Sequence, residues 1–365
     1  MAGNRRRRRR PGVTSDSGSG AEPQGVLGPL TSAAIFLVLT VDPGGEERVR
    51  DLLADLPGLR RSVGFGVPGG QLSSVVGIGS QAWDRLFDYP RPAQLHPFRE
   101  LTGPRHHAPA TPGDLLFHLR ATRLDLCFLL ASHIMDRLRG AVTLEDEVQG
   151  FKFQDVRDLL GFVDGTENPE GAAAKAAALI GDEDPDHTGG SYVIVQKYLH
   201  DLDAWNTLPV EAQEKIIGRR KASNVELDED ASHVALNTIT GPDGEERQIL
   251  RDNMPFGSPG RGEFGTYFIG YAGTPEVTEQ MLDTMFCGNG SAPYDRILDF
   301  STAVTGTLFY VPSADFLDDL PPLPFGGQAA VIPSAPGEPE PGVLAPAPSS
   351  GGSLGIGNLN RSTTP

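Results

Sequence analysis

The sequence predicts an α+β fold made of two similarly arranged halves. Between residues 30 and 320, apolar segments typical of strands are followed by segments with the spacing of amphipathic helices, and this order of elements occurs twice. The 365 residues are 38% hydrophobic, which is enough for a substantial core. No apolar run reaches the roughly 18 residues that a membrane-spanning helix needs. We therefore expect a folded body between two polar ends, and no membrane partner.

The first half begins with a β-α-β pattern. The run "AAIFLVLTV" at 33–41 predicts a buried strand, and 46–59 has apolar residues at helical spacing. The segment 72–79 predicts a second strand. Residues 114–121 then predict a strand that leads directly into an amphipathic helix at 123–138.

The second half repeats this order without clear sequence identity to the first. Strand-like 191–202 precedes helix-like 209–220, and strand-like 265–273 precedes 275–286, where Pro275 suits a first helical turn. Two ferredoxin-like halves, each with helices on one face of an antiparallel sheet, satisfy the pattern. A pocket between the halves is then the expected ligand site.

The two ends of the chain differ from this body in composition. The N-terminal end is rich in Arg, Gly and Ser and contains a run from Arg5 to Arg10, which we interpret as a solvated tail with weak polyanion contact as the alternative. The net charge of −17 disfavours specific nucleic-acid binding. An export signal is disfavoured because a polar spacer follows the arginines. The predicted boundaries are 1–29 for the tail, 30–160 and 161–320 for the two domains, 321–352 for a Pro/Gly-rich linker, and 353–365 for a terminal peptide.

Cysteine usage is low. Cys127 and Cys287 are too few for a disulfide framework and form no CxxC or CxxCH motif. This argues against covalent haem attachment and fits a reducing cytoplasm.

One motif has both a structural and a chemical interpretation. In "GFVDGTENP", at 161–169, Asp164 suits a tight turn, and the local sequence alone favours that role. The same ambiguity applies to His233 in "SHVALNT" and to Arg251 and Asn253 in "ILRDNMPFG". Each is most simply a surface or turn residue when taken alone.

The ordered set of motifs resembles one family. "GFVDGTENP", "SHVALNT", "ILRDNMPFG", "GTYFIGYA" and "YDRILDFSTAVTGTLFYVPS" are similar to the dye-decolourising peroxidases, specifically the bacterial B-type branch, and the resemblance covers about 30–320. It implies tandem ferredoxin-like domains with non-covalent haem b in the C-terminal half. It also implies peroxide-driven one-electron oxidation of dyes, phenols and, in some members, Mn(II). A haem carrier or haem-iron-release protein is the alternative, and a ferredoxin-like module without haem is a third candidate.

The resemblance assigns His233 as the haem iron ligand and Asp295 as its partner. A ligating histidine usually donates its other ring N–H to a carboxylate, which fixes the tautomer and increases electron donation to the metal. Asp299, four residues after Asp295, is a less favoured substitute.

On the other side of the haem, the resemblance assigns Asp164, Arg251 and Asn253 to catalysis. A carboxylate within about 3 Å can move the peroxide proton, and a fixed guanidinium and amide can stabilise the charge that develops as the O–O bond breaks. Because strand side chains repeat with period two, Arg251 and Asn253 should enter one pocket together.

Four further residues match family positions. Arg219 is assigned to a haem propionate, since its planar fork suits a carboxylate, with Arg220 as a competitor. Glu167, Glu226 and Glu246 match positions linked to manganese oxidation. Oxygen ligands suit Mn²⁺, but exposed acids are more often solvated.

The C-terminal peptide has a pattern of its own. "GGSLGIGNLNRS", at 351–362, places Leu354, Ile356 and Leu359 among glycines, a short apolar series able to lie in a groove of another protein. It resembles the cargo-loading peptides of encapsulin shells. We therefore expect the protein to be packaged in an encapsulin nanocompartment, which would lie in the cytoplasm. We also expect a homo-oligomer, from dimer to hexamer.

Overall fold

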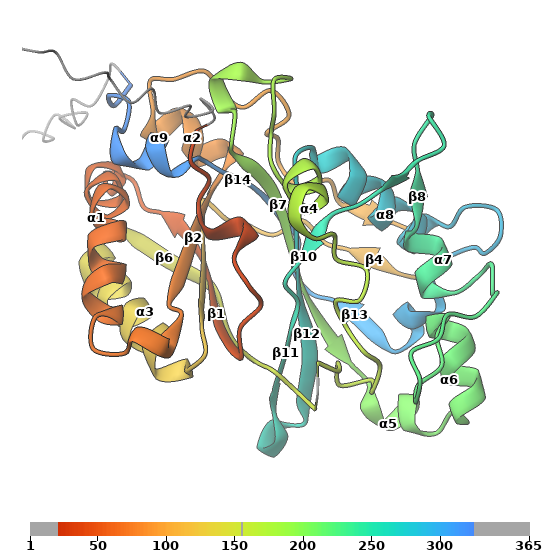
Figure 1. Cartoon of the computed structure of the whole chain (residues 1–365). Helices are drawn as coiled ribbons and strands as arrows, with labels where there is room; N and C mark the ends of the chain where they lie inside the picture. Colours follow the sequence, from red (N-terminus) through yellow and green to blue (C-terminus); the bar gives the residue numbers. More distant parts are fainter. Residues whose placement is uncertain (1–20, 155, 325–365) are drawn as a thin grey trace, which may run out of the picture. The chain divides into compact units, whose positions relative to one another are not determined.

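The computed structural model describes residues 21–154 and 156–324 (Figure 1). The arginine run and the peptide with Leu354, Ile356 and Leu359 lie outside these residues.

The N-terminal half has the ferredoxin-like order β-α-β-β-α-β. Its elements are β1 (Ala33–Val41), α1 (Glu46–Gly64), β2 (Ser73–Gly79), β5 (Leu115–Ala121), α3 (Leu124–Leu138) and β6 (Val142–Phe151). The four strands are antiparallel in the order β2-β5-β1-β6. Helices α1 and α3 contact each other and lie together on one side of these strands (Figure 1). The strand predicted at 33–41 is confirmed.

The C-terminal half repeats this arrangement. Its main elements are β7 (Ser191–His200), α5 (Leu202–Asn206), α6 (Val210–Ile217), β10 (Leu250–Arg251), β11 (Met254–Ser258), β12 (Glu263–Ala272), α8 (Pro275–Cys287) and β14 (Thr307–Val311). The strand order β10-β12-β7-β14 is equivalent to that of the first half, and β11 also pairs with β12. The predicted α+β class with tandem ferredoxin-like halves is confirmed.

Short elements connect these strands and helices. The remaining α-helices and strands are α2 (Ser80–Leu86), β3 (Leu101–Thr102), β4 (His107–Ala108), α4 (Gly171–Ala178), α7 (His233–Asn237), β8 (Ile239–Thr240), β9 (Glu246–Arg247), β13 (Ser301–Ala303) and α9 (Ala314–Asp318). Single 3-10 turns occupy Gly25–Leu27, Pro68–Gly70, Pro185–His187, Pro259–Arg261 and Arg296–Asp299.

The two halves share one sheet. Strand β14 pairs with β2, with Phe309 opposite Gly79, and this joins the strands into a ten-stranded sheet. At the other end β6 contacts β11. A Cβ atom on Gly150 of β6 would lie 2.4 Å from Met254 Cβ, so this close approach requires glycine.

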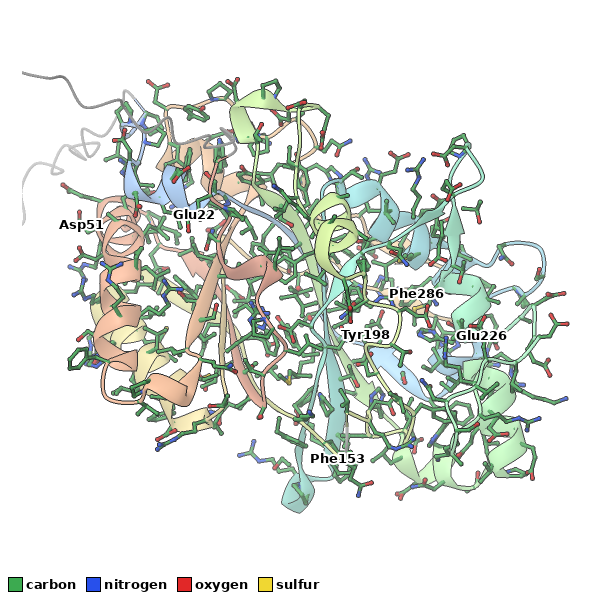
Figure 2. All side chains as sticks on the ribbon, in the orientation of Figure 1. Glu22, Asp51, Phe153, Tyr198, Glu226 and Phe286 are labelled. Atoms are coloured by element: carbon green, nitrogen blue, oxygen red, sulfur yellow. The ribbon has the colours of Figure 1, made fainter. Side chains whose placement is uncertain are left out.

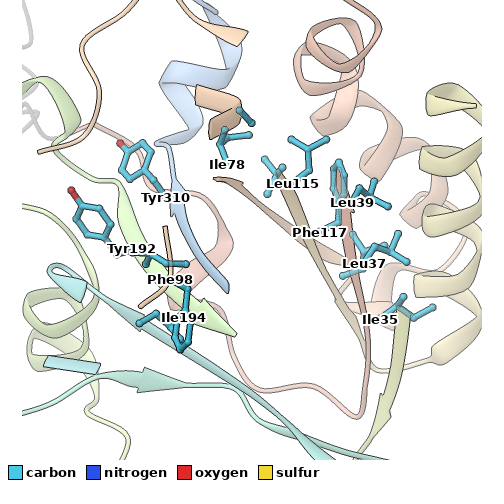
Figure 3. Close-up of a cluster of buried hydrophobic side chains, with 14 of the residues drawn as sticks. Ile35, Leu37, Leu39, Ile78, Phe98, Leu115, Phe117, Tyr192, Ile194 and Tyr310 are labelled. Carbon is cyan, nitrogen blue, oxygen red and sulfur yellow. The ribbon is translucent and has the colours of Figure 1, made fainter. Parts of the chain in front are cut away.

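Strand β1 is buried on both of its faces. Ile35, Leu37 and Leu39 of β1 belong to the cluster beneath the helices (Figure 3). Phe36 and Val38 alternate with them and belong to a second cluster on the opposite face. Burial on both faces explains why β1 is a continuous apolar run. In the described part of the chain, no helix is both long and apolar enough to cross a membrane.

Candidate active site

A cavity lies in the C-terminal half. Its lining residues all fall between 158 and 301 and come from the loop before α4 and from β7, α6, α7, β9, β10, β12, α8 and β13. The expected pocket between the halves is therefore wrong for this cavity. The halves meet through the β2–β14 pairing, whereas α8 contacts β7 and β12 as well as α7, and residues of these four elements line the cavity. The apolar part of the wall consists of Leu160, Phe162, Val163, Ile217, Val234, Phe268, Met281, Leu282, Met285 and Ile297.

His233 enters this cavity at the start of α7. Ser232 caps the helix by accepting a hydrogen bond from Ala235 N. His233 Nδ1 lies 2.6 Å from Asp295 Oδ2, and Asp295 is fully buried and also accepts from Ile297 N at 3.0 Å. A carboxylate accepts only, so Nδ1 carries the proton and Nε2 keeps its lone pair for a metal. Burial disfavours the charged ring, but Asp295 outweighs this effect and raises the pKa of His233 above its ordinary value.

Asn237 is a member of this group that the sequence analysis missed. Its Nδ2 donates to His233 O at 2.8 Å and lies 3.4 Å from Asp295 Oδ2. Asn237 follows the candidate ligand His233 by four residues on a helix, so the two side chains lie on the same helix face. This spacing could have predicted the contact.

Asp299, the substitute considered for Asp295, lies elsewhere. It accepts from Tyr294 Oη at 3.2 Å and pairs with His106 at 3.3 Å. Asp295, and not Asp299, is the carboxylate against His233.

Asp164 has both of the roles considered for it, in the turn and in the cavity. Its Oδ1 accepts from Gly165 N at 2.7 Å, and Gly165 has a φ of +79°, so Asp164 shapes the turn. Asp164 also lines the cavity. A second acid, Asp158, lines it as well. Burial raises the pKa of Asp158 to about 7, with Asp164 adding to the shift and a hydrogen bond from Phe162 N opposing it.

Arg251 and Asn253 line the cavity from the segment spanning β10 and β11. Asn253 Oδ1 accepts from Ile269 N at 3.1 Å, so the amide nitrogen keeps its donors. Arg251 is held through its backbone by Asn168, whose Oδ1 accepts from Arg251 N at 2.9 Å and whose Nδ2 donates to Arg251 O at 2.6 Å. Asn168 was not predicted, although it stands in the same motif as Asp164. Burial lowers the pKa of Arg251, and nearby acids oppose this effect.

Arg219 has two acidic neighbours at the rim. Its Nη2 donates to Glu167 and, at 3.0 Å, to Glu226, which lies outward from the sheet in Figure 2. Glu246 lines the cavity with Glu167. Arg220 instead pairs with Glu214 at 2.8 Å. Within residues 21–154 and 156–324, no three His, Cys, Asp or Glu side chains converge closely enough to hold a metal ion.

The donor set fits an iron porphyrin. One imidazole has a free nitrogen, the walls are largely apolar, and Arg219 and Arg251 are cations suited to propionates or to anionic oxygen. His200 also lines the cavity, but both of its ring nitrogens are engaged, by Ser301 Oγ at 2.8 Å and Thr266 Oγ1 at 2.9 Å. His233 is therefore the cavity histidine with a nitrogen to offer.

Comparison with protein families identifies the chain. The family model described as "Dyp-type peroxidase, N-terminal" matches residues 23–152, and "Dyp-type peroxidase, C-terminal" matches residues 155–316. This chain belongs to the Dyp-type peroxidase family. It is therefore an enzyme of the haem peroxidase class.

Individual relatives are similar to this peroxidase in sequence over most of its length. The dye-decolorizing peroxidase of Rhodococcus erythropolis is 61% identical over 346 residues, covering 94% of this chain and 98% of that protein. The Mycobacterium tuberculosis dye-decolorizing peroxidase is 60% identical over 306 residues, covering 83% and 91%.

Solved structures of the family are similar in fold. The encapsulated DyP-type peroxidase from Mycobacterium smegmatis has a TM-score of 0.82 and 61% identity, covering 83% of this chain and 100% of that one. A variant of DypB from Rhodococcus jostii in complex with heme has a TM-score of 0.79 and 56% identity, covering 83% and 100%. A DypB variant in complex with manganese has a TM-score of 0.80 and 56% identity, covering 82% and 99%.

Proposed function

We propose that this peroxidase holds haem b non-covalently in the cavity and uses hydrogen peroxide to oxidise dyes and phenols one electron at a time. The observation that carries the proposal is that one cavity contains both a carboxylate-backed imidazole and the set Asp164, Arg251 and Asn253. The heme complex of the related DypB supports the choice of cofactor.

His233 holds the iron through Nε2. When bound, haem supplies the metal that binds peroxide and the ring that stores oxidising equivalents. Asp295 accepts a hydrogen bond from Nδ1, orients the imidazole and makes Nε2 a stronger electron donor to the metal. Asn237 fixes the same carboxylate from the next turn of α7.

Asp164, Arg251 and Asn253 act on peroxide. The Asp164 carboxylate accepts a proton from the bound peroxide oxygen and returns it to the oxygen that leaves as water. The half-buried Arg251 guanidinium stabilises the negative charge that develops on the leaving oxygen, and its effect exceeds that in water because apolar side chains line much of the cavity. The Asn253 amide donates a hydrogen bond to the same charge.

Haem titration tests the proposal. Haem-free protein is titrated with haemin and the Soret band is followed for the wild type, His233→Ala and His200→Gln. We expect His233→Ala alone to lose the spectrum of a histidine-ligated haem, because His200 has no free nitrogen. An unchanged spectrum in His233→Ala refutes the assignment, and a normal haem complex without dye oxidation favours a carrier role.

Manganese oxidation requires a rearrangement at the rim. We propose that Mn²⁺ binds among Glu167, Glu226 and Glu246 once Arg219 turns away from two of them to a haem propionate. The manganese complex of a DypB variant supports this proposal. Mn(II) oxidation should then fall in Glu226→Gln while dye oxidation persists. Equal loss of both activities would contradict it.

We also propose that the chain is encapsulin cargo in the cytoplasm. The terminal series Leu354, Ile356 and Leu359 and the encapsulated relative from Mycobacterium smegmatis support this proposal. Several tails on one oligomer would bind several shell sites together, so modest groove affinity suffices. Co-expression with a shell protein should load the full chain and not a chain ending at Gly352. A triple substitution of the three apolar residues by serine keeps the length and serves as the control for tail length.

A further inference from the structure

A buried tyrosine and histidine form a hydrogen-bonded pair behind the active site. Tyr271 Oη lies 2.8 Å from His118 Nδ1, and neither residue is exposed to solvent. Tyr271 belongs to β12 and His118 to β5, so the pair joins the two halves of the chain.

The pair lies on the face of β12 opposite to the face that lines the cavity. On β12, Thr266 and Phe268 line the cavity, whereas Tyr267 and Tyr271 belong to the core on the opposite face. Gly270, beside Tyr271, pairs with Arg251 of the cavity wall. Side chains on opposite faces of a strand are separated by roughly 10 Å, the scale of layer spacing in packed sheets.

His118 is the hydrogen-bond partner of the Tyr271 hydroxyl, and its ring is neutral at rest. Burial, reinforced by Arg120, lowers the pKa of His118 well below its ordinary value, so the ring is neutral at rest. Its Nε2 has no hydrogen-bond partner among the described residues but lies 3.7 Å from Asp252 Oδ2, and a carboxylate at that distance favours hydrogen on Nε2 and a lone pair on Nδ1. The phenol of Tyr271 is then the donor of the 2.8 Å hydrogen bond. Asp252, which also pairs with Arg120, is the counter-charge for a protonated His118.

Tyr267 is a natural contrast on the same strand and face. It is 1% exposed and stacks on Phe36 at 4.1 Å, and Phe36 stacks on His118 at 4.7 Å. Its hydroxyl has no hydrogen-bond partner among the described residues. The fold therefore tolerates a buried tyrosine hydroxyl without a partner at this face, and packing alone does not explain the base opposite Tyr271.

We propose that Tyr271 and His118 form an internal redox site that gives one electron to the active site when no reducing substrate is present. Tyr271 loses the electron to the haem centre that peroxide has oxidised, and its O–H bond breaks. The proton moves to His118 Nδ1, which leaves a neutral tyrosyl radical and an imidazolium. When a reducing substrate of the peroxidase arrives, it gives one electron to the radical, and the proton returns from His118 Nδ1 to the Tyr271 oxygen, which restores the pair. Tyr267 lacks a base and does not compete, because an oxidised phenol that keeps its proton is a much stronger oxidant.

The inference rests on the proposed haem binding, and the experiment separates the two. Haem-loaded full-length chain is mixed with one equivalent of peroxide without reductant, frozen, and examined by electron paramagnetic resonance. Ring-deuterated tyrosine assigns the signal to tyrosine. We expect loss of the tyrosyl signal in Tyr271→Phe, its retention in Tyr267→Phe, and its loss or a changed line shape in His118→Gln, whose amide accepts no proton.

Two results would overturn the inference. One is an unchanged tyrosyl signal in Tyr271→Phe, and the other is a wild type that forms no tyrosyl signal although its Soret band responds to peroxide. If a substituted chain does not fold, high-field spectra of the wild type decide, because a radical beside an imidazolium donor has a lower largest g value than one without a donor. A Soret band that does not respond to peroxide in the wild type would instead contradict the proposed function.

Discussion

The hydrogen bonds between Asn168 and Arg251 give a quantitative prediction. Asn168→Ala removes an acceptor at 2.9 Å from Arg251 N and a donor at 2.6 Å from Arg251 O. Each such bond contributes about 0.5 to 1.5 kcal/mol net, so the free energy of unfolding should fall by about 1 to 3 kcal/mol. The side chain of Arg251 would remain, but its backbone would lose a fixed position.

The kinetic effect should exceed what this stability loss implies. A misplacement of about 1 Å in a catalytic group can cost on the order of 100-fold in rate. We therefore expect the second-order rate constant for peroxide to fall roughly 10-fold to 100-fold at a temperature where the variant is fully folded. The KM for a dye should change little, because Asn168 acts through Arg251. Stopped-flow measurement of the Soret change after peroxide addition reports this rate directly.

Two controls distinguish a displaced Arg251 from a general loss of stability. Asn206→Ala changes an exposed asparagine on α5 and should leave both the rate and the stability unchanged. Haem content, measured for each protein, excludes loss of the cofactor. If Asn168→Ala is less stable but reacts with peroxide at the wild-type rate, Asn168 supports the loop only and the positioning argument is wrong.

Three further substitutions test the electrostatics. Asp295→Asn should lower the pKa of His233 in haem-free protein, because the carboxylate that raises it is gone, and an unchanged NMR titration of the ring would contradict this. Asp158 has a folded-state pKa of about 7 against an ordinary 3.8, so the wild type should lose stability relative to Asp158→Asn as pH rises from about 4 to 7. A shift of about 3 pKa units corresponds to a difference on the order of 4 kcal/mol at pH 8, and equal differences in thermal unfolding at pH 4 and pH 8 would refute the shift. Asp252→Ala should cost about 3 to 5 kcal/mol in denaturant unfolding because it leaves Arg120 buried without its partner, and a loss below 1 kcal/mol would contradict a buried charged pair.

The hydrophobic pattern of the sequence predicted strands well where the whole strand is buried. Strand β1 was predicted with its observed bounds because burial on both faces gives an uninterrupted apolar run. Strand β6 (Val142–Phe151) was missed because most of its side chains are exposed, so no apolar alternation marks it. Helix α6 ends at Ile217, before the predicted 220, because Gly218 adopts a φ of +94° and ends the helix.

Hydrophobic periodicity could not predict most contacts in the active site, because they join residues that are far apart in the sequence. The period of two correctly predicted that Arg251 and Asn253 face one cavity. The hydrogen bond between His233 and Asp295 spans 62 residues of sequence, and no local spacing predicts such a pairing. Asn168 was missed for the same reason, since its partner is 83 residues away.

The segment 250–253 shows how the N-terminal half contributes to a site that it does not line. Arg251 and Asn253 face the cavity, whereas Asp252 between them faces the core and pairs with Arg120 of β5. The backbone of Arg251 is held at the same time by Asn168 on the loop that carries Asp164. The segment is therefore fixed by a buried ion pair from one half and by an amide from the other. Because both anchors must form before the guanidinium is in place, we expect substitutions of Arg120 to slow the peroxide reaction although Arg120 lies outside the cavity lining.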